Sequence, residues 1–188
     1  MVITSAKQRK VIEAYISLLQ EGHSEEMITM KRIAAKAGMS RGNLYHNHFS
    51  SIRQIRDRFF YLSDENLEAK VKDFVFNHKY DEAGVFLERV ILPYFYEQRA
   101  WIEVLFTTEL ISEWNMYLTQ KYMPMVEEYL IQIGKKEKFS NSFLAQLIVR
   151  EFFAIIATWL TQKSPESPLL FYKEFQRFSK SSLYDLLN

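Results

Sequence analysis

The sequence predicts an all-α fold of about nine helices, with a small N-terminal three-helix domain that contains a helix-turn-helix and a larger helical domain. Three observations predict this fold. Apolar residues recur at helical spacing along most of the chain, no segment sustains the alternation of a strand, and capping residues or glycines separate the apolar stretches. The expected boundary places residues 1–50 in the first domain and residues 51–188 in the second.

The first helix is expected to run from Ser5 to about Gln20, where apolar residues recur at helical spacing, and Gly22 ends it. Two short helices joined by a tight turn are then expected within residues 29–45. Thr29 caps the first of them, because a hydroxyl at this position accepts a bond from a free backbone N–H. Gly38 supplies the positive φ of the turn. This is the helix-turn-helix shape that places one helix in the DNA major groove.

The second helix of this motif begins with Arg41-Gly42-Asn43, which brings a guanidinium, bare backbone and an amide to the end that enters the groove. We expect these residues to contact bases or phosphates; the alternative is an ordinary solvated helix start. Tyr45 is expected to donate its hydroxyl to a phosphate, with core packing of its ring as the alternative. The full set of expected DNA contacts is Thr29, Lys31, Ser40, Arg41, Gly42, Asn43, Tyr45, His46 and His48.

His46 and His48 invite a metal-site interpretation, which the spacing disfavours. Two residues apart on a helix they point to different sides, and no cysteine or nearby carboxylate cluster completes a site. Contact with the DNA backbone or a packed ring is expected instead. We expect no metal, no cofactor and no catalytic residue.

A long helix is expected from Ser50 or Ser51 to about Asn77, joining the two domains. Pro93 is expected to kink or break the next helix, and Pro124 to divide a later one. Further helices are expected over Trp101–Trp114, from Ser140 to Leu160–Gln162, and from the turn at 164–168 to Leu187.

Composition narrows the class of protein. With 48% hydrophobic and 25% charged residues, the chain has the composition of an ordinary folded protein. No apolar run approaches the ~18 residues of a membrane span, and no secretory leader is expected at the N-terminus. The absence of cysteine excludes disulfides and thiolate metal sites, and fits a cytoplasmic protein.

Charge and aromatic residues are divided in opposite ways between the two parts of the chain. Residues 1–58 contain ten Lys and Arg against five Asp and Glu, whereas residues 59–188 contain fourteen against eighteen. A basic first part suits a module that faces phosphates, although a chance imbalance would give the same difference. All but three of the aromatic residues follow residue 58, which favours a deep core, a ligand cavity or an oligomer interface there.

The aromatic residues of the second domain are candidates for a small-molecule pocket among the middle helices, and for each ring the alternative is core or dimer interface. The ligand would be mostly apolar or aromatic, with Met116, Met123 and Met125 as adaptable lining. Glu103, Glu109 and Glu113 are expected to face water rather than a cationic ligand. The ligand-binding candidates are Trp101, Phe106, Trp114, Tyr117 and Phe153.

The segment from about Val11 to Ile55 resembles the DNA-binding domain of the TetR family of transcriptional regulators. The resemblance implies a homodimer that forms through the last two helices of each subunit, a palindromic DNA operator, and a body that binds a small-molecule effector and then releases the DNA. It covers roughly a quarter of the chain. The matching residues are Thr29, Ile33-Ala34, Ala37-Gly38, Ser40, Gly42, Leu44-Tyr45 and His48-Phe49.

Two departures from the family pattern stand at the end of the motif. The family usually has one residue between the Tyr and the His-Phe pair, whereas this chain has His46 and Asn47. The extra residue must lengthen the recognition helix or its exit turn. The family also tends to place a phosphate-binding Lys where this chain has Ile52, and Arg53 or Arg56 could substitute for it.

We therefore expect a DNA-binding transcriptional regulator, a repressor, rather than an enzyme. The chain has no Gly-x-Ser-x-Gly, no phosphate-binding glycine loop and no metal-ligand cluster. The alternative is a helical adaptor or ligand-binding protein of the same fold without sequence-specific DNA binding. The modest basic charge and the residue at position 52 keep that alternative open.

Overall fold

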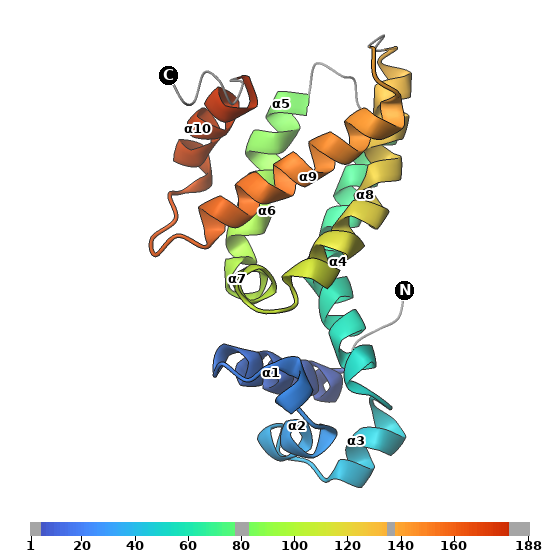
Figure 1. Cartoon of the computed structure of the whole chain (residues 1–188), viewed down its shortest axis with the longest axis vertical. Coiled ribbons are helices and arrows are strands. Elements are labelled where there is room, and N and C mark those ends of the chain that lie inside the picture. Colours follow the sequence, from blue (N-terminus) through green and yellow to red (C-terminus); the bar gives the residue numbers. More distant parts are fainter. Residues whose placement is uncertain (1–4, 78–82, 135–137, 181–188) are drawn as a thin grey trace.

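The computed structural model describes residues 5–77, 83–134 and 138–180, and these residues are all-α, as predicted. If α5, the π turn after it and α6 are taken as one continuous helix, the described residues form nine helices. The helices build a small head and a larger body, and α4 runs from one into the other (Figure 1).

The head consists of α1 (Ala6–Gln20), a 3-10 turn (Glu25–Met27), α2 (Met30–Lys36) and α3 (Arg41–Asn47). Local capping defines these helices as the sequence predicts. Ser5 and Gln8 bond reciprocally at the start of α1, and Thr29 Oγ1 accepts from the backbone N–H of Arg32 at the start of α2. Gly22 and Gly38 have the positive φ values of +82° and +68° that end α1 and form the turn.

The body begins with α4 (Ile52–Asn77), whose first turns pack on the head. The core is continuous across the junction, because Ile55 and Phe59 of α4 are fully buried together with Tyr15 of α1. The other elements are α5 (Ala83–Phe86), the π turn (Leu87–Ile91), α6 (Leu92–Glu97), α7 (Arg99–Thr107), α8 (Ile111–Gln132), α9 (Asn141–Leu160) and α10 (Pro168–Lys180). The predicted extension of the last helix to Leu187 lies outside the described residues.

Two expectations about prolines need correction. Pro124 does not divide a helix, because α8 continues through it. Proline removes the bond to the carbonyl four residues earlier, and that residue, Gln120, lies with Pro124 on the exposed side of α8, where water reaches it. Pro93 lies in the first turn of α6, and α6 follows the π turn. The helix therefore has one wider turn before the proline and is not broken at it.

The expected single helix over Trp101–Trp114 is also wrong. Helix α7 ends at Thr107, Thr108 is extended with ψ of 176°, and α8 starts at Ile111. The hydroxyl of Thr108 donates to the carbonyl of Val104, 2.7 Å away, and so satisfies a free acceptor at the helix end. The periodicity of apolar residues crosses this break, because both helices bury one face in the same core.

Helix α9 qualifies the expectation that no segment is apolar enough to span a membrane. By length and composition, it is the one helix of the described residues that could do so. Arg150 and Glu151 interrupt its apolar run, and Val149, Phe153 and Ile156 are buried in the core of the body. Core helices of soluble proteins pass the same test.

Candidate nucleic-acid interface and ligand cavity

Helix α3 is held in place from both ends and from beneath. The Oγ of Ser40 accepts a bond of 3.1 Å from the backbone N–H of Asn43, so Ser40 caps the helix. Leu44 is fully buried in the core that also contains side chains of α1 and α2, and Met39 packs on the same core. Both residues between Tyr45 and His48 belong to α3, which ends at Asn47, and His48 closes it with its N–H bonded to the carbonyl of Leu44.

The opposite side of α3 faces solvent and carries the residues expected to contact DNA. Arg41, Gly42, Tyr45 and His46 are exposed. The guanidinium carbon of Arg41 lies 5.3 Å from the centre of the Tyr45 ring, a cation–π contact that orders both side chains. A Cβ added to Gly42 would meet no atom within 4 Å, so no packing in the protein requires a glycine there.

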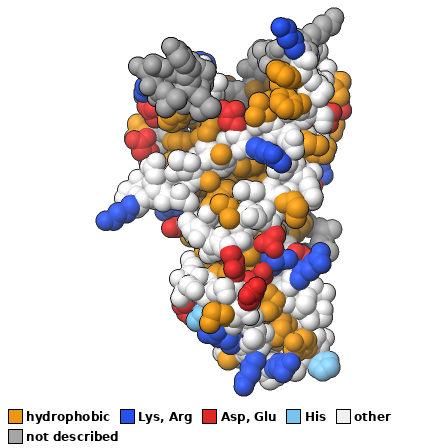
Figure 2. Space-filling view, in the orientation of Figure 1, with side chains coloured by type: hydrophobic (Ala, Val, Ile, Leu, Met, Phe, Trp, Pro, Cys, Tyr) orange, Lys and Arg blue, Asp and Glu red, His pale blue; other side chains and the backbone are white. Residues whose placement is uncertain are grey.

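The remaining predicted contacts lie around this face. Lys31 and Thr29 are exposed at the start of α2, and Ser40 is exposed at the start of α3. His48 differs, because its ring is half-buried and its Nε2 is shielded from solvent without a hydrogen-bond partner among the described residues. Figure 2 shows Lys, Arg and His side chains gathered at the end of the head, around α2 and α3.

The two arginines considered as substitutes for the missing lysine have different positions. The side chain of Arg53 is 81% exposed, and among the described residues its ion pair is a 3.8 Å contact with Asp57 on its own helix. Arg56 turns inward, and its Nη1 lies 2.9 Å from Glu25 of the head and 2.9 Å from Glu113 of α8. Arg53 is therefore the one that is free to reach a phosphate.

Arg56 belongs to a charged cluster where the head meets the body, visible in Figure 2 as acidic side chains at the waist. Tyr15 donates its hydroxyl to Glu25 over 2.7 Å, and burial together with this bond raises the pKa of Tyr15. Glu109 accepts a bond from the backbone N–H of Glu25. Of the three glutamates expected to face water, Glu109 thus also contacts the head, and Glu113 pairs with Arg56.

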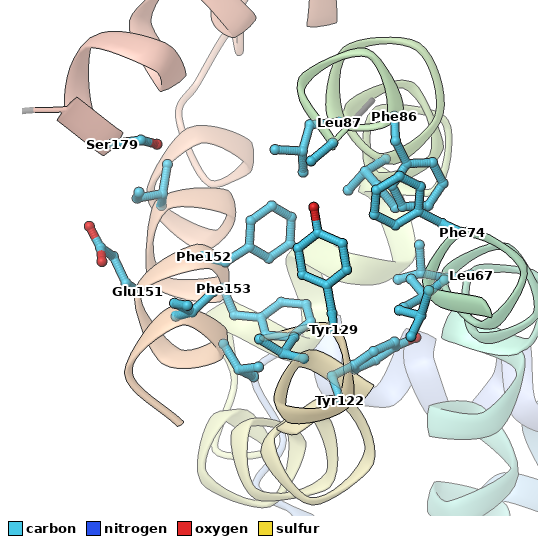
Figure 3. Close-up of a pocket in the computed structure, with 18 of the residues that line it drawn as sticks. Leu67, Phe74, Phe86, Leu87, Tyr122, Tyr129, Glu151, Phe152, Phe153 and Ser179 are labelled. Carbon is cyan, nitrogen blue, oxygen red and sulfur yellow. The ribbon is translucent and has the colours of Figure 1, made fainter. Parts of the chain in front are cut away.

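A cavity of about 450 Å³ lies in the body between α4, α5, α6, α8, α9 and α10. Its wall is formed by aromatic and aliphatic side chains, and this size and lining suit a small apolar ligand. In Figure 3, Phe74 and Phe86 stand on one side and Phe152 on the other, while Glu151 and Ser179 lie at one edge. The Phe74 and Phe86 rings stack 4.3 Å apart.

Of the five predicted ligand-binding residues, Phe153 lines this cavity and the other four lie elsewhere. Trp101 packs at the junction, with its ring 5.5 Å from Phe59. Trp114 and Tyr117 stack on each other in the interior at 5.3 Å. Phe106 and Phe153 both line a second, more polar hollow of about 810 Å³ between α8 and α9.

Several residues that form the cavity were not among the predicted ligand-binding residues. Leu67, Val71, Phe74 and Val75 lie on α4 at helical spacing, which predicts an inward face but not whether that face meets side chains or a void. The same holds for Tyr122 and Tyr129 on α8. Their rings line the wall because α8 packs against α4 in the tertiary structure.

A buried ionic network underlies the cavity at Tyr122. The carboxylate of Asp64, 1% exposed, accepts bonds from Tyr117, Lys121 and Tyr122 over 2.9 to 3.0 Å. Burial raises the pKa of Asp64, although Lys121 opposes this shift. Burial by itself would lower the pKa of Lys121, but Glu68, Tyr117 and Asp64 together raise it. Burial and the neighbouring Asp64 charge raise the pKa of Tyr117 to about 12.

Comparison with solved structures identifies the fold. The chain is similar to the TetR family repressor AlkX from Dietzia sp. strain DQ12-45-1b, implicated in biodegradation of n-alkanes, with a TM-score of 0.53, 17% identity, and 94% of this chain and 95% of that chain covered. It is also similar to the dihydroxyacetone kinase operon activator DhaS, with a TM-score of 0.52, 14% identity, and 92% and 93% covered. The chain has the fold of TetR family regulators.

At these identities the similarity establishes the TetR fold alone. No family model matches the sequence, and no curated protein matches it. One of the two neighbours is an activator and the other a repressor, so the TetR fold does not decide the direction of regulation.

Proposed function

We propose that the protein is a cytoplasmic transcriptional regulator, a repressor, that binds a palindromic operator as a homodimer and is released by a small, mostly apolar effector. The observation that carries this proposal is the exposed side of α3. It presents Arg41, Gly42, Tyr45 and His46 at the outer end of a head that is anchored by the buried Leu44. A helix that projects from the molecule with such side chains on its outer side can enter the major groove.

The distribution of charge supports DNA as the partner. The first 58 residues carry twice as many basic as acidic residues, and two of the acidic ones, Glu25 and Glu21, are engaged in ion pairs inside the head or at its junction. Exposed cations around α2 and α3 would replace counterions on the phosphates, which makes affinity depend steeply on salt.

The cavity supports an apolar effector, and its walls connect to the head. Helix α4 lines the cavity with Leu67 and Phe74 and carries Arg56 at the junction. Helix α8 lines it with Tyr122 and carries Glu113 at the same junction. A ligand that binds one arrangement of these helices better than another therefore changes the position of the head.

Exposed apolar side chains support a dimer through α9 and α10. Exposed apolar side chains that form a large patch mark a surface that a partner covers. They lie on both of the last two helices, at Phe143, Leu147 and Ile148 of α9 and at Leu169, Leu170 and Phe178 of α10.

The proposal is tested by selecting sites from a library of random DNA duplexes with the purified protein, followed by titration of the best site at several salt concentrations. We expect one palindromic sequence to be enriched, with affinity falling steeply as salt rises. Sedimentation at micromolar concentration should give a dimer. Binding no tighter than to random DNA would contradict the proposal and favour an adaptor or ligand-binding protein of the TetR fold.

A further inference from the structure

The exposed side of α3 has three rows of side chains, each one helical turn long. Successive residues of a helix are about 100° apart, so the row of Gly42 and His46 lies opposite the buried Leu44. Two i, i+4 rows flank it, namely Arg41 with Tyr45 on one side and Asn43 with Asn47 on the other. Each flanking row is joined internally, by a cation–π contact in the first and by a hydrogen bond in the second.

The second row is a pair of amides in a fixed orientation. The Nδ2 of Asn47 donates to the Oδ1 of Asn43 over 2.8 Å, and Ser40 holds the backbone N–H of Asn43. This bond turns the oxygen of Asn43 toward Asn47, and among the described residues neither N–H of the Asn43 amide has a partner, so both can donate. On Asn47 it leaves the carbonyl oxygen free to accept. The pair therefore presents a donor and an acceptor on one flank of the helix.

We propose that Asn47 is a specificity-determining residue that positions Asn43, and that the two amides together bind the major-groove edge of an adenine. Adenine presents an acceptor at N7 and a donor at its N6 amino group. Asn43 would donate to N7, and Asn47 would accept from the amino group. The inference rests on the proposed DNA binding and adds the base that is read and the residue at the end of α3 that positions Asn43.

A base edge suits the pair better than a phosphate does. A phosphate only accepts hydrogen bonds, so the free oxygen of Asn47 would face a negatively charged acceptor. The pair also carries no charge and contributes nothing to counterion release. Loss of Asn47 should therefore change base preference at one position and leave the dependence on salt unaltered.

The test uses the full-length protein and a random duplex library, with Asn43→Ala, Asn47→Ala, Asn47→Asp and the control Asn77→Ala. Asn77 makes the same kind of exposed i, i+4 bond, to Asp73, at the far end of α4. We expect wild type and Asn77→Ala to require adenine at one position of each half-site. Asn47→Ala should weaken that discrimination by roughly 5- to 150-fold, as should Asn43→Ala, and a variant that combines Asn43→Ala with Asn47→Ala should lose no more than either one.

Two further measurements separate positioning from damage to the helix. Replacing the preferred adenine by 7-deazaadenine, which lacks the N7 acceptor, should weaken wild type but not Asn43→Ala. Asn47→Asp can only accept, so it turns the amide of Asn43 around and should move the preference away from adenine. A wild type that selects no sequence would overturn the proposed function itself. A wild type that selects a site, with Asn47→Ala either selecting it equally well or losing discrimination at every position alike, would overturn the role of Asn47 alone.

Discussion

Arg56 and Glu113 form an ion pair of 2.9 Å between α4 and α8, and the same Nη1 atom of Arg56 lies 2.9 Å from Glu25 of the head. The guanidinium of Arg56 thus joins α4, α8 and the head, which must move together if a ligand in the cavity is to change the position of the head. Arg56 and Glu25 are mostly buried, with side chains 17% and 21% exposed, so solvent screens this contact less than it screens a surface pair.

Replacing Arg56 by Met should lower the free energy of unfolding by about 1–3 kcal/mol, because partly buried carboxylates lose their partner. Arg53→Met is the matched control on the same helix. Arg53 is exposed and weakly paired, so its loss should change stability by less than about 0.5 kcal/mol. Urea unfolding followed by circular dichroism measures both. An equal loss of unfolding free energy in the two variants would mean that the contacts of Arg56 at the junction stabilise the protein no more than an exposed ion pair does.

Gly42→Ala should separate folding from DNA binding. An added methyl group meets open space in the protein, and alanine favours a helix over glycine by about 1 kcal/mol. We therefore expect the variant to melt at a higher temperature while it binds the selected operator more weakly, because the methyl group keeps the backbone from the DNA. Thermal melting and fluorescence anisotropy measure the two effects. Stronger or unchanged operator binding would show that the glycine is not needed for close approach.

Arg41→Ala should relax base preference by about 1–3 kcal/mol at the position that Arg41 contacts. Arg53→Ala provides the contrast, because an exposed cation outside the recognition helix can bind only the backbone. It should weaken binding to all sequences alike and reduce the slope of log affinity against log salt by about 1. Competition titrations with single-base operator variants decide between the two patterns, and an Arg41→Ala protein with full discrimination would contradict this assignment.

Lys121→Met should destabilise the protein by about 3–5 kcal/mol at pH 8, because Asp64 remains buried without its cation. Without Lys121 the folded-state pKa of Asp64 rises further above its unfolded value. A carboxyl group of this kind favours the folded state at low pH and loses that contribution as the pH rises through the folded pKa. The loss should therefore be smaller at pH 5 than at pH 8.

Lys72→Met is the control for this network. Lys72 pairs with Glu68 at an exposed i, i+4 position, so its removal should cost less than about 0.5 kcal/mol at either pH. Denaturation curves at both pH values test the pair of variants. If Lys121→Met is as stable as Lys72→Met, then Lys121 does not stabilise the buried carboxylate of Asp64.

Val126→Trp should fill part of the cavity and prevent the uncharged fluorescent probe N-phenyl-1-naphthylamine from binding in it. Val85→Trp makes the same substitution at an exposed position of α5 that does not line the cavity, and should bind the probe like wild type. Fluorescence titration compares the three proteins. Full binding by Val126→Trp would place the probe elsewhere.

Residues with the same local sequence features have different positions in the tertiary structure. Arg53 and Arg56 are equivalent in type and lie one turn apart, yet one is solvated and the other is at the junction, because only the packing of α8 on α4 brings Glu113 beside Arg56. Asp64 and Lys121 are far apart in the sequence and gave no local signal. Trp114 and Phe153 are both aromatic residues of the body and equally good candidates for a cavity wall by sequence. Only the tertiary structure shows that Phe153 lines the cavity and that Trp114 packs in the core.

The sequence by itself determined the features that depend on contacts within one or two turns. Ser5, Thr29, Ser40 and Ser140 cap helices because each meets a free N–H three residues away, and Gly22, Gly38 and Gly134 take positive φ beyond the ends of helices, or in the turn after one, because they lack a Cβ. Tertiary structure decided which helix faces enclose a cavity and which cations are available to a partner. Those outcomes depend on the angles between helices, which are set by the packing of all their side chains together.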